Sequence, residues 1–130
     1  MSILQKAMGP VLLIEDDGDT RALMTEFLGQ AGYRVIASDE GRKAIELAGA
    51  TRPCLVLLDL RTGGMNGWQF LDRRRDEPAL AHVPVVVVSG HPRAVPPGVA
   101  AVLTKPVSAD ELLATIQRLT RTKRRAVPTG

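Results

Sequence analysis

The sequence lacks the means to form an internal disulfide, because its 130 residues include a single cysteine, Cys54. It also lacks an N-terminal segment that combines a positive region, a long apolar region and a small-residue cleavage site. No apolar run approaches the ~20 residues that a helix needs to cross a bilayer. These absences argue against a secreted or membrane-spanning protein, and we expect a reducing, cytoplasmic location and no membrane partner.

The sequence also lacks a strong excess of positive or negative charge, except near the end of the chain. The formal net charge is +3, and the basic excess is concentrated in residues 118–125. Because the remainder is nearly balanced, nucleic-acid binding is not expected. A chain of 130 residues with 45% hydrophobic content suits one domain with a single core. We expect this domain over residues 1–120, followed by a basic, disordered tail over residues 121–130.

Short apolar runs predict five β-strands, because they are often β-branched and are bounded by Gly, Pro or Asp. The predicted strands are residues 11–14, 34–38, 55–59, 83–89 and 100–104. Three of these runs are apolar almost throughout. Such runs are typical of a parallel sheet that helices cover on both faces.

The segments between the predicted strands have helical spacing. In the first, Asp19 is the expected N-cap and Gly32 the expected left-handed C-terminal residue, with Leu23, Phe27 and Ala31 recurring every four residues. Apolar residues at 44, 45, 47 and 48 mark a second helix. A third is expected to begin after an Asn66-Gly67 turn, with apolar residues at 68, 70 and 71.

A capping box at residues 108–111 opens the last predicted helix, whose inward residues are Leu112, Leu113, Ile116 and Leu119. The alternation of strands and helices predicts a doubly wound α/β domain with right-handed crossovers. In such sheets, ligands collect beyond the carboxyl ends of the strands, where the strand order reverses.

Acidic residues follow two of the apolar runs. Glu15, Asp16 and Asp17 come directly after the first run, and Asp59 ends the third. Carboxylates that converge at strand ends repel one another, and a divalent cation relieves that repulsion. Magnesium suits such a site because it is commonly held by one or two carboxylates together with phosphate oxygens. Asp16 and Asp59 are the proposed direct ligands, with Glu15 acting directly or through water.

Each of these residues alone has an ordinary structural interpretation. Asp17 is expected to be only a helix N-cap, and Asp59 could be a turn residue. A serine such as Ser89 is usually a strand-end hydrogen bonder, and a lysine such as Lys105 is usually solvated. These interpretations do not explain why all four types of side chain fall at strand ends in one α/β pattern. A shared acidic site explains it.

Together these residues resemble the receiver domain of bacterial two-component response regulators. The resemblance rests on Val-Leu-Leu-Ile-Glu-Asp-Asp at 11–17, Asp59 followed by Met-Asn-Gly at 65–67, Ser89 at the end of a valine strand, and Lys105-Pro106. It covers residues 11 to about 119. It implies a flavodoxin-like, five-stranded parallel sheet in the order 2-1-3-4-5 and a cis Lys105–Pro106 peptide bond.

The resemblance also implies a function. Asp59 would accept a phosphoryl group, with Mg²⁺ bound, from a phosphohistidine on a sensor histidine kinase or phosphotransfer protein. Ser89 and Lys105 would assist, and the main-chain carbonyl of Arg61 would be the third protein ligand of the metal. The domain would catalyse its own phosphorylation and dephosphorylation, without being an enzyme for another substrate. As a monomer or weak dimer, it would bind a downstream protein differently in its two states.

Two departures from the family affect how the signal leaves the site. Val102 stands where the family often has an aromatic residue. Residues 90–98 contain three prolines, and the interval from Ser89 to Lys105 is shorter than usual. We therefore expect the fourth helix to be shortened or lost.

Three alternatives to a stand-alone phosphoacceptor remain open. The first is a degenerate receiver that acts as a constitutive protein-binding module. The second is the receiver fragment of a hybrid kinase or larger regulator. The third is a phosphohydrolase with an aspartyl nucleophile, but such enzymes have a second aspartate two residues after the nucleophile, where this chain has Arg61.

Overall fold

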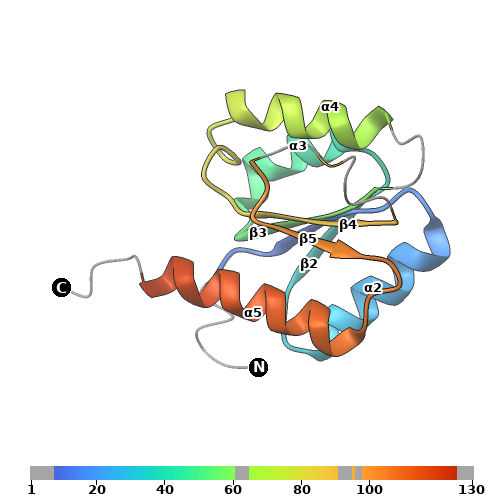
Figure 1. Ribbon diagram of the computed structural model, residues 1–130. Coiled ribbons are helices and arrows are strands. Elements are labelled where there is room, and N and C mark those ends of the chain that lie inside the picture. The colour runs from blue at the N-terminus through green and yellow to red at the C-terminus, as the bar shows by residue number, and fades with distance from the viewer. Residues whose placement is uncertain (1–7, 61–64, 91–94, 96–97, 126–130) are drawn as a thin grey trace.

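The computed structural model describes residues 8–60, 65–90, 95 and 98–125. Its centre is a parallel sheet of five strands in the order β2-β1-β3-β4-β5 (Figure 1). The strands are β1 (Val11–Ile14), β2 (Val35–Ser38), β3 (Leu55–Leu60), β4 (Val85–Ser89) and β5 (Ala101–Thr104). Every predicted strand is present with nearly the predicted bounds, and the predicted fold class is confirmed.

Helices cover both faces of the sheet, as in a doubly wound fold. Helices α3 (Gly41–Thr51) and α4 (Met65–Arg73) lie on one face, and α2 (Gly18–Gln30) and α5 (Ala109–Arg125) lie on the other (Figure 1). A short 3₁₀ helix, η1 (Arg74–Asp76), follows α4. No helix among the described residues is both long and apolar enough to cross a membrane.

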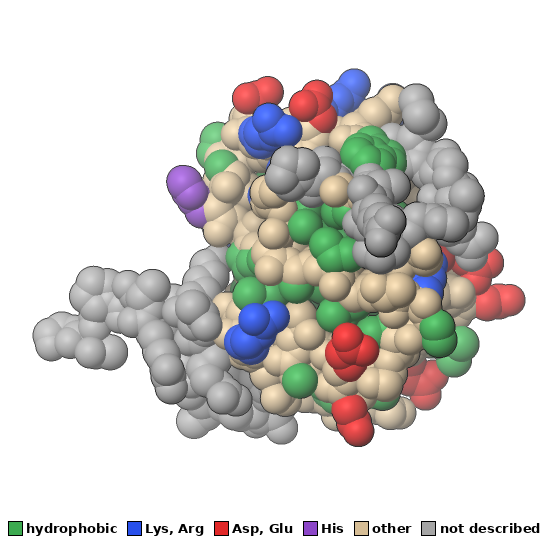
Figure 2. All heavy atoms as spheres, viewed as in Figure 1, with side chains coloured by type: hydrophobic (Ala, Val, Ile, Leu, Met, Phe, Trp, Pro, Cys, Tyr) green, Lys and Arg blue, Asp and Glu red, His purple; other side chains and the backbone are tan. Residues whose placement is uncertain are grey.

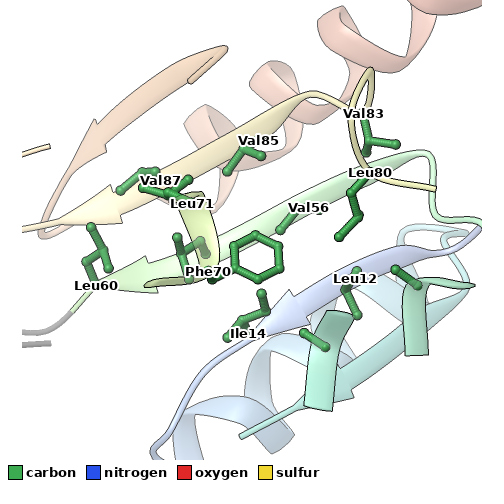
Figure 3. Packing of buried hydrophobic residues seen from close by; sticks show 13 residues of the cluster. Leu12, Ile14, Val56, Leu60, Phe70, Leu71, Leu80, Val83, Val85 and Val87 are labelled. Atoms are coloured by element: carbon green, nitrogen blue, oxygen red, sulfur yellow. The ribbon is translucent and has the colours of Figure 1, made fainter. Parts of the chain in front are cut away.

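The sheet separates two hydrophobic clusters, because successive side chains of a strand point to opposite faces. On the α3–α4 side, Leu12 and Val56 pack with Phe70 of α4, whose ring lies among the strand side chains (Figure 3). On the other side, Leu13 packs in a cluster with residues of α2 and α5, including Ile116. The three central strands, β1, β3 and β4, are therefore buried on both faces, which explains why they are apolar almost throughout.

Helix α2 uses one of its two expected N-caps and differs from the prediction in its buried face. Asp17, not Asp19, is the N-cap: its Oδ2 accepts a hydrogen bond from the Thr20 backbone N–H at 2.9 Å. Leu23 is 68% exposed, whereas Leu28 is fully buried. Leu23 belongs to the expected apolar face of the helix but is not buried, because a spacing of four does not tell which side of the helix meets the sheet.

The other helices agree better with the sequence. Gly32 after α2 has φ +99°, the predicted left-handed conformation. Ser108 caps α5 by accepting a hydrogen bond from the Glu111 backbone N–H at 3.0 Å. Helix α4 begins at Met65, so the expected turn at 66–67 lies within the helix, despite the weak helix propensity of Asn and Gly. Helix α5 continues to Arg125, so residues 121–125, expected in a disordered tail, are helical.

No helix is present among the described residues between β4 and β5, in agreement with the expected loss or shortening of the fourth helix. Strand β5 forms an edge of the sheet, and Val102 on it is 36% exposed. Figure 2, viewed from the same side as Figure 1, shows hydrophobic side chains at the surface in the middle of the molecule, between the two helix layers.

Candidate functional site

The predicted site residues lie at the carboxyl ends of four neighbouring strands. Glu15 directly follows β1, Asp59 is the next-to-last residue of β3, Ser89 ends β4 and Lys105 directly follows β5. The register pairs Leu60 with Ser89, and Ser89 with Thr104, so these ends are level with one another. The parallel sheet alone therefore gathers residues that are far apart in the sequence.

Asp59 and Lys105 form the central contact of the site. The Lys105 Nζ lies 2.5 Å from Asp59 Oδ1, and the Asp59 side chain is only 6% exposed. The Lys105 backbone N–H also donates to the Ser89 carbonyl oxygen at 2.9 Å, and the Lys105–Pro106 peptide bond is cis, as expected. Lys105 reaches Asp59 from the surface, because its own side chain is 36% exposed. Removing Lys105 would leave the buried Asp59 charge without this partner, which is costly away from water.

Glu15 is a second buried carboxyl group beside Asp59. It is 1% exposed, and burial is the main reason that its pKa is raised to about 7. A hydrogen bond with the Asp59 side chain and the charge of Asp59 raise this pKa further, while a hydrogen bond from the Asp17 backbone N–H, at 3.1 Å, lowers it. Glu15 therefore responds directly to the charge at Asp59.

The two acidic residues after Glu15 have different environments. Asp16 is exposed, and its charge is the smallest of the causes that raise the pKa of Glu15. Asp17 is occupied as the N-cap of α2, where its Oδ2 accepts from both the backbone N–H and the hydroxyl of Thr20. Asp17 is thus a capping residue, as predicted, while Asp16 faces solvent near the site.

The residues present fit Mg²⁺, although no three Asp, Glu, His or Cys side chains form a ready metal cluster in the described part of the chain. Mg²⁺ usually binds through one or two carboxylates and keeps several waters, so Glu15 and Asp59 are sufficient as a pair. The repulsion that raises the pKa of Glu15 is what a divalent cation would relieve. Arg61, whose carbonyl was the third expected ligand, lies outside the described residues.

Ser89 is 5% exposed at the end of β4. Arg21 was not predicted. Its Nη1 donates to the Glu15 carbonyl oxygen at 2.9 Å, and the Glu15 backbone N–H donates to the Ser38 carbonyl oxygen at 3.0 Å. These contacts hold the backbone that carries Glu15. No sequence signal distinguishes Arg21 from a surface arginine, because its acceptor is a main-chain oxygen.

Known proteins share this fold and up to about a third of the aligned residues. A family described as the response regulator receiver domain matches residues 11–117. Protein Rrf1 of Nitratidesulfovibrio vulgaris is 34% identical over 91% of this chain and 87% of its own length. The transcriptional regulatory protein HprR of Escherichia coli is 34% identical over 82% of this chain, but the chain spans only about half (49%) of HprR.

Solved structures show the same architecture. The chemotaxis protein CheY4 of Vibrio cholerae superimposes with a TM-score of 0.74, at 26% identity over 86% of this chain and 98% of that one. The receiver domain of the sensor histidine kinase PA1611 of Pseudomonas aeruginosa, solved with a magnesium ion in its active site cleft, has a TM-score of 0.75. It is 24% identical over 88% of this chain and 98% of that one, a likeness of fold alone.

Proposed function

Because the chain belongs to the response regulator receiver domain family, we propose that Asp59 accepts a phosphoryl group and that its phosphorylation switches the binding of a partner protein. The observation that carries the proposal is the contact between the buried Asp59 carboxylate and the Lys105 ammonium, 2.5 Å away, with Glu15 as a second buried carboxyl group at Asp59. An acidic group held by a cation at a strand end is suited to in-line attack on phosphorus.

In this mechanism, a carboxylate oxygen of Asp59 attacks the phosphorus atom of a phosphohistidine. The bond between phosphorus and the imidazole nitrogen breaks, an acyl phosphate forms on Asp59, and the imidazole leaves with the bonding electron pair. Lys105 donates hydrogen bonds to the phosphoryl oxygens as they shift, and the Ser89 hydroxyl donates another. Attack by water later returns Asp59 to its free carboxylate and releases inorganic phosphate.

Glu15, Asp16 and Asp59 would hold Mg²⁺, with the Arg61 main-chain carbonyl. The ion, when bound, would neutralise the carboxylates and the phosphoryl oxygens, so that the two anionic reactants can approach. Glu15 contributes best as a carboxylate. With a pKa of about 7 in the metal-free site, Glu15 therefore favours Mg²⁺ binding above neutral pH over binding below it.

The proposed phosphoryl donor is a sensor histidine kinase or a phosphotransfer protein, and the proposed target is another protein. Response regulators and histidine kinases both contain receiver domains. The chain is 32% identical to part of the sensor histidine kinase TmoS of Ectopseudomonas mendocina, of which it spans 12%. The proposal covers a stand-alone regulator in the cytoplasm, as a monomer or weak dimer, and equally a receiver within a larger kinase.

The test is to incubate the protein with MgCl₂ and acetyl phosphate, a small phosphodonor, and to measure the intact mass. We expect an acid-labile adduct of one phosphoryl group on the wild type and none on Asp59→Asn. Asp72→Asn is the matched control, because Asp72 is exposed on α4 and should leave the adduct unchanged. Absence of an adduct on the wild type would contradict the proposal.

A second candidate function is constitutive protein binding by a receiver that has lost its switch. The altered connection between β4 and β5 favours it, because the family's output face normally includes a helix there. The contact between Asp59 and Lys105 argues against it, since a module without phosphoryl chemistry has no need of a buried acceptor. Partner binding that is equal for wild type and Asp59→Asn, with and without phosphodonor, would support this candidate.

A further inference from the structure

Strand β5 leads to Lys105 and is held in the sheet from one side. It is an edge strand that pairs with β4 alone, and Leu103 is the single buried residue of its four. In the described part of the connection from β4, no helix packs beside it. The position of Lys105 therefore depends on what fixes the chain just before β5.

Arg74 makes a contact at this point. It opens η1, and its Nη2 donates to the Gly98 carbonyl oxygen at 2.8 Å. Its Nη1 lies 3.5 Å from the Val83 carbonyl oxygen, a long contact that adds little alone. Gly98 comes shortly before β5, and Val83 comes shortly before β4. One guanidinium group thus lies between the two segments that lead into these neighbouring strands.

The environment of Arg74 indicates that this contact is its main role. The side chain is half-buried, and burial is the chief reason that its pKa is lowered, followed by the charge of Arg75. A guanidinium stays charged in proteins, so hydrogen bonds must offset its loss of water. Among the described residues, Arg74 donates to main-chain carbonyl oxygens and has no carboxylate partner. The guanidinium group therefore interacts with the backbone at Gly98 and Val83.

The segment that Arg74 contacts is also packed against the protein. Val95 and Val99 pack on the hydrophobic cluster of the α3–α4 side. Gly98 has φ +96°, a left-handed conformation that a side chain would strain. The next sheet hydrogen bond follows at once, from the Ala100 backbone N–H to the Val85 carbonyl oxygen at 2.9 Å. The contact thus lies immediately before the point at which the chain joins the sheet.

We propose that Arg74 is a positioning residue: its hydrogen bond to Gly98 holds the start of β5 in register with β4 and thereby keeps the Lys105 ammonium beside Asp59. A strand of four residues spans only about 13 Å, so a loosened start reaches its far end. Directly after that far end, the Lys105 backbone N–H donates a hydrogen bond to the Ser89 carbonyl oxygen. The role in phosphoryl transfer rests on the function proposed above for Asp59.

The first test is hydrogen exchange of single backbone amides by NMR in the full chain. Arg74→Met removes the hydrogen bond and keeps an apolar stem, and Arg75→Met is the matched control at an exposed neighbour. We expect the Ala100 and Lys105 amides to exchange at least about tenfold faster in Arg74→Met than in the wild type. In Arg75→Met they should exchange at the wild-type rate.

The second test separates positioning from a general loss of stability. With acetyl phosphate and MgCl₂, Arg74→Met should be phosphorylated at least about tenfold more slowly. Its affinity for Mg²⁺, measured by isothermal titration calorimetry, should stay within about twofold, because Glu15 follows β1 and Asp59 lies on β3, away from β5 in the sheet order. Arg74→Lys should give intermediate rates, since an ammonium keeps the charge without the planar fork.

Equal amide exchange at Ala100 and Lys105 in Arg74→Met and Arg75→Met would overturn the proposal. A parallel fall of phosphorylation rate and Mg²⁺ affinity would also overturn it, because that pattern marks general destabilisation. Should Arg74→Met not fold, Arg74→Lys is judged by the same criteria. If the wild type accepts no phosphoryl group, the function proposed for Asp59 fails, while amide exchange still decides whether Arg74 holds β5.

Discussion

Glu15 is the residue through which pH should act on this protein. Its pKa is raised from 4.5 to about 7 in the fold, mainly by burial, so the folded state binds a proton that the unfolded state releases. The stabilisation from this proton is complete below about pH 4.5 and is lost as the pH rises through about 7. Without metal, we expect the free energy of unfolding to fall by up to about 3 kcal/mol across this window.

Urea unfolding at several pH values between 4.5 and 8, with a chelator present, measures this effect. Glu15→Gln should remove that fall in stability, because the amide does not titrate. Glu46→Gln, at an exposed position of α3, should keep it. The same slope in Glu15→Gln as in the wild type would show that another group is responsible.

At the scale of elements, α2 shows which part of a helix stabilises the fold. Leu28 is fully buried on the sheet, whereas Leu23 in the same helix is 68% exposed. Leu28→Ala should lower the free energy of unfolding by about 2–5 kcal/mol, since it leaves a cavity. Leu23→Ala should change it by less than about 0.5 kcal/mol.

Urea unfolding of the two variants under identical conditions checks this comparison. Both substitutions remove the same atoms from leucine in the same helix, so helix propensity affects them alike. Similar losses of stability in both variants would mean that Leu23 is covered in solution, for example by another protein molecule.

The elements also show what the sequence can and cannot predict. The bounds of the strands are predictable nearly to the residue, because a strand that is buried on both faces is a continuous apolar run between turn residues. The buried face of α2 differs from the apolar spacing at Leu23, because packing on the sheet decides which side of the helix is covered, and α4 begins at Met65, before the expected turn. Periodicity alone does not contain that information.

The same difference applies to the site. Glu15, Asp59, Ser89 and Lys105 were predictable because they end strands, and parallel strands bring their carboxyl ends to one edge. Arg21 and Arg74 were not, because each donates to main-chain oxygens. Such acceptors occur at every residue, so nothing in the sequence marks the partner.

For the whole molecule, Mg²⁺ should act as a stabilising ligand, because only the folded chain brings Glu15 and Asp59 together. At a hundredfold excess over its dissociation constant, it should add about 2.7 kcal/mol to the free energy of unfolding. The effect should be larger at pH 8 than at pH 6, since a proton on Glu15 competes with the metal.

Thermal unfolding followed by circular dichroism, with and without MgCl₂, measures this stabilisation. Asp59→Asn should lose most of it, and the exposed-site variant Asp72→Asn should keep it. A Mg²⁺ effect that is equal in all three proteins would place the ion elsewhere on the molecule.

The contact between Asp59 and Lys105 has a consequence for the synthesis of the protein. Glu15 and Asp59, which lie at the ends of β1 and β3, leave the ribosome well before Lys105, which directly follows β5. A nascent or truncated chain that ends before β5 would contain the acceptor without its cation. If Asp59 accepts a phosphoryl group as proposed, its phosphorylation would require a chain that has been synthesised through β5 and Lys105.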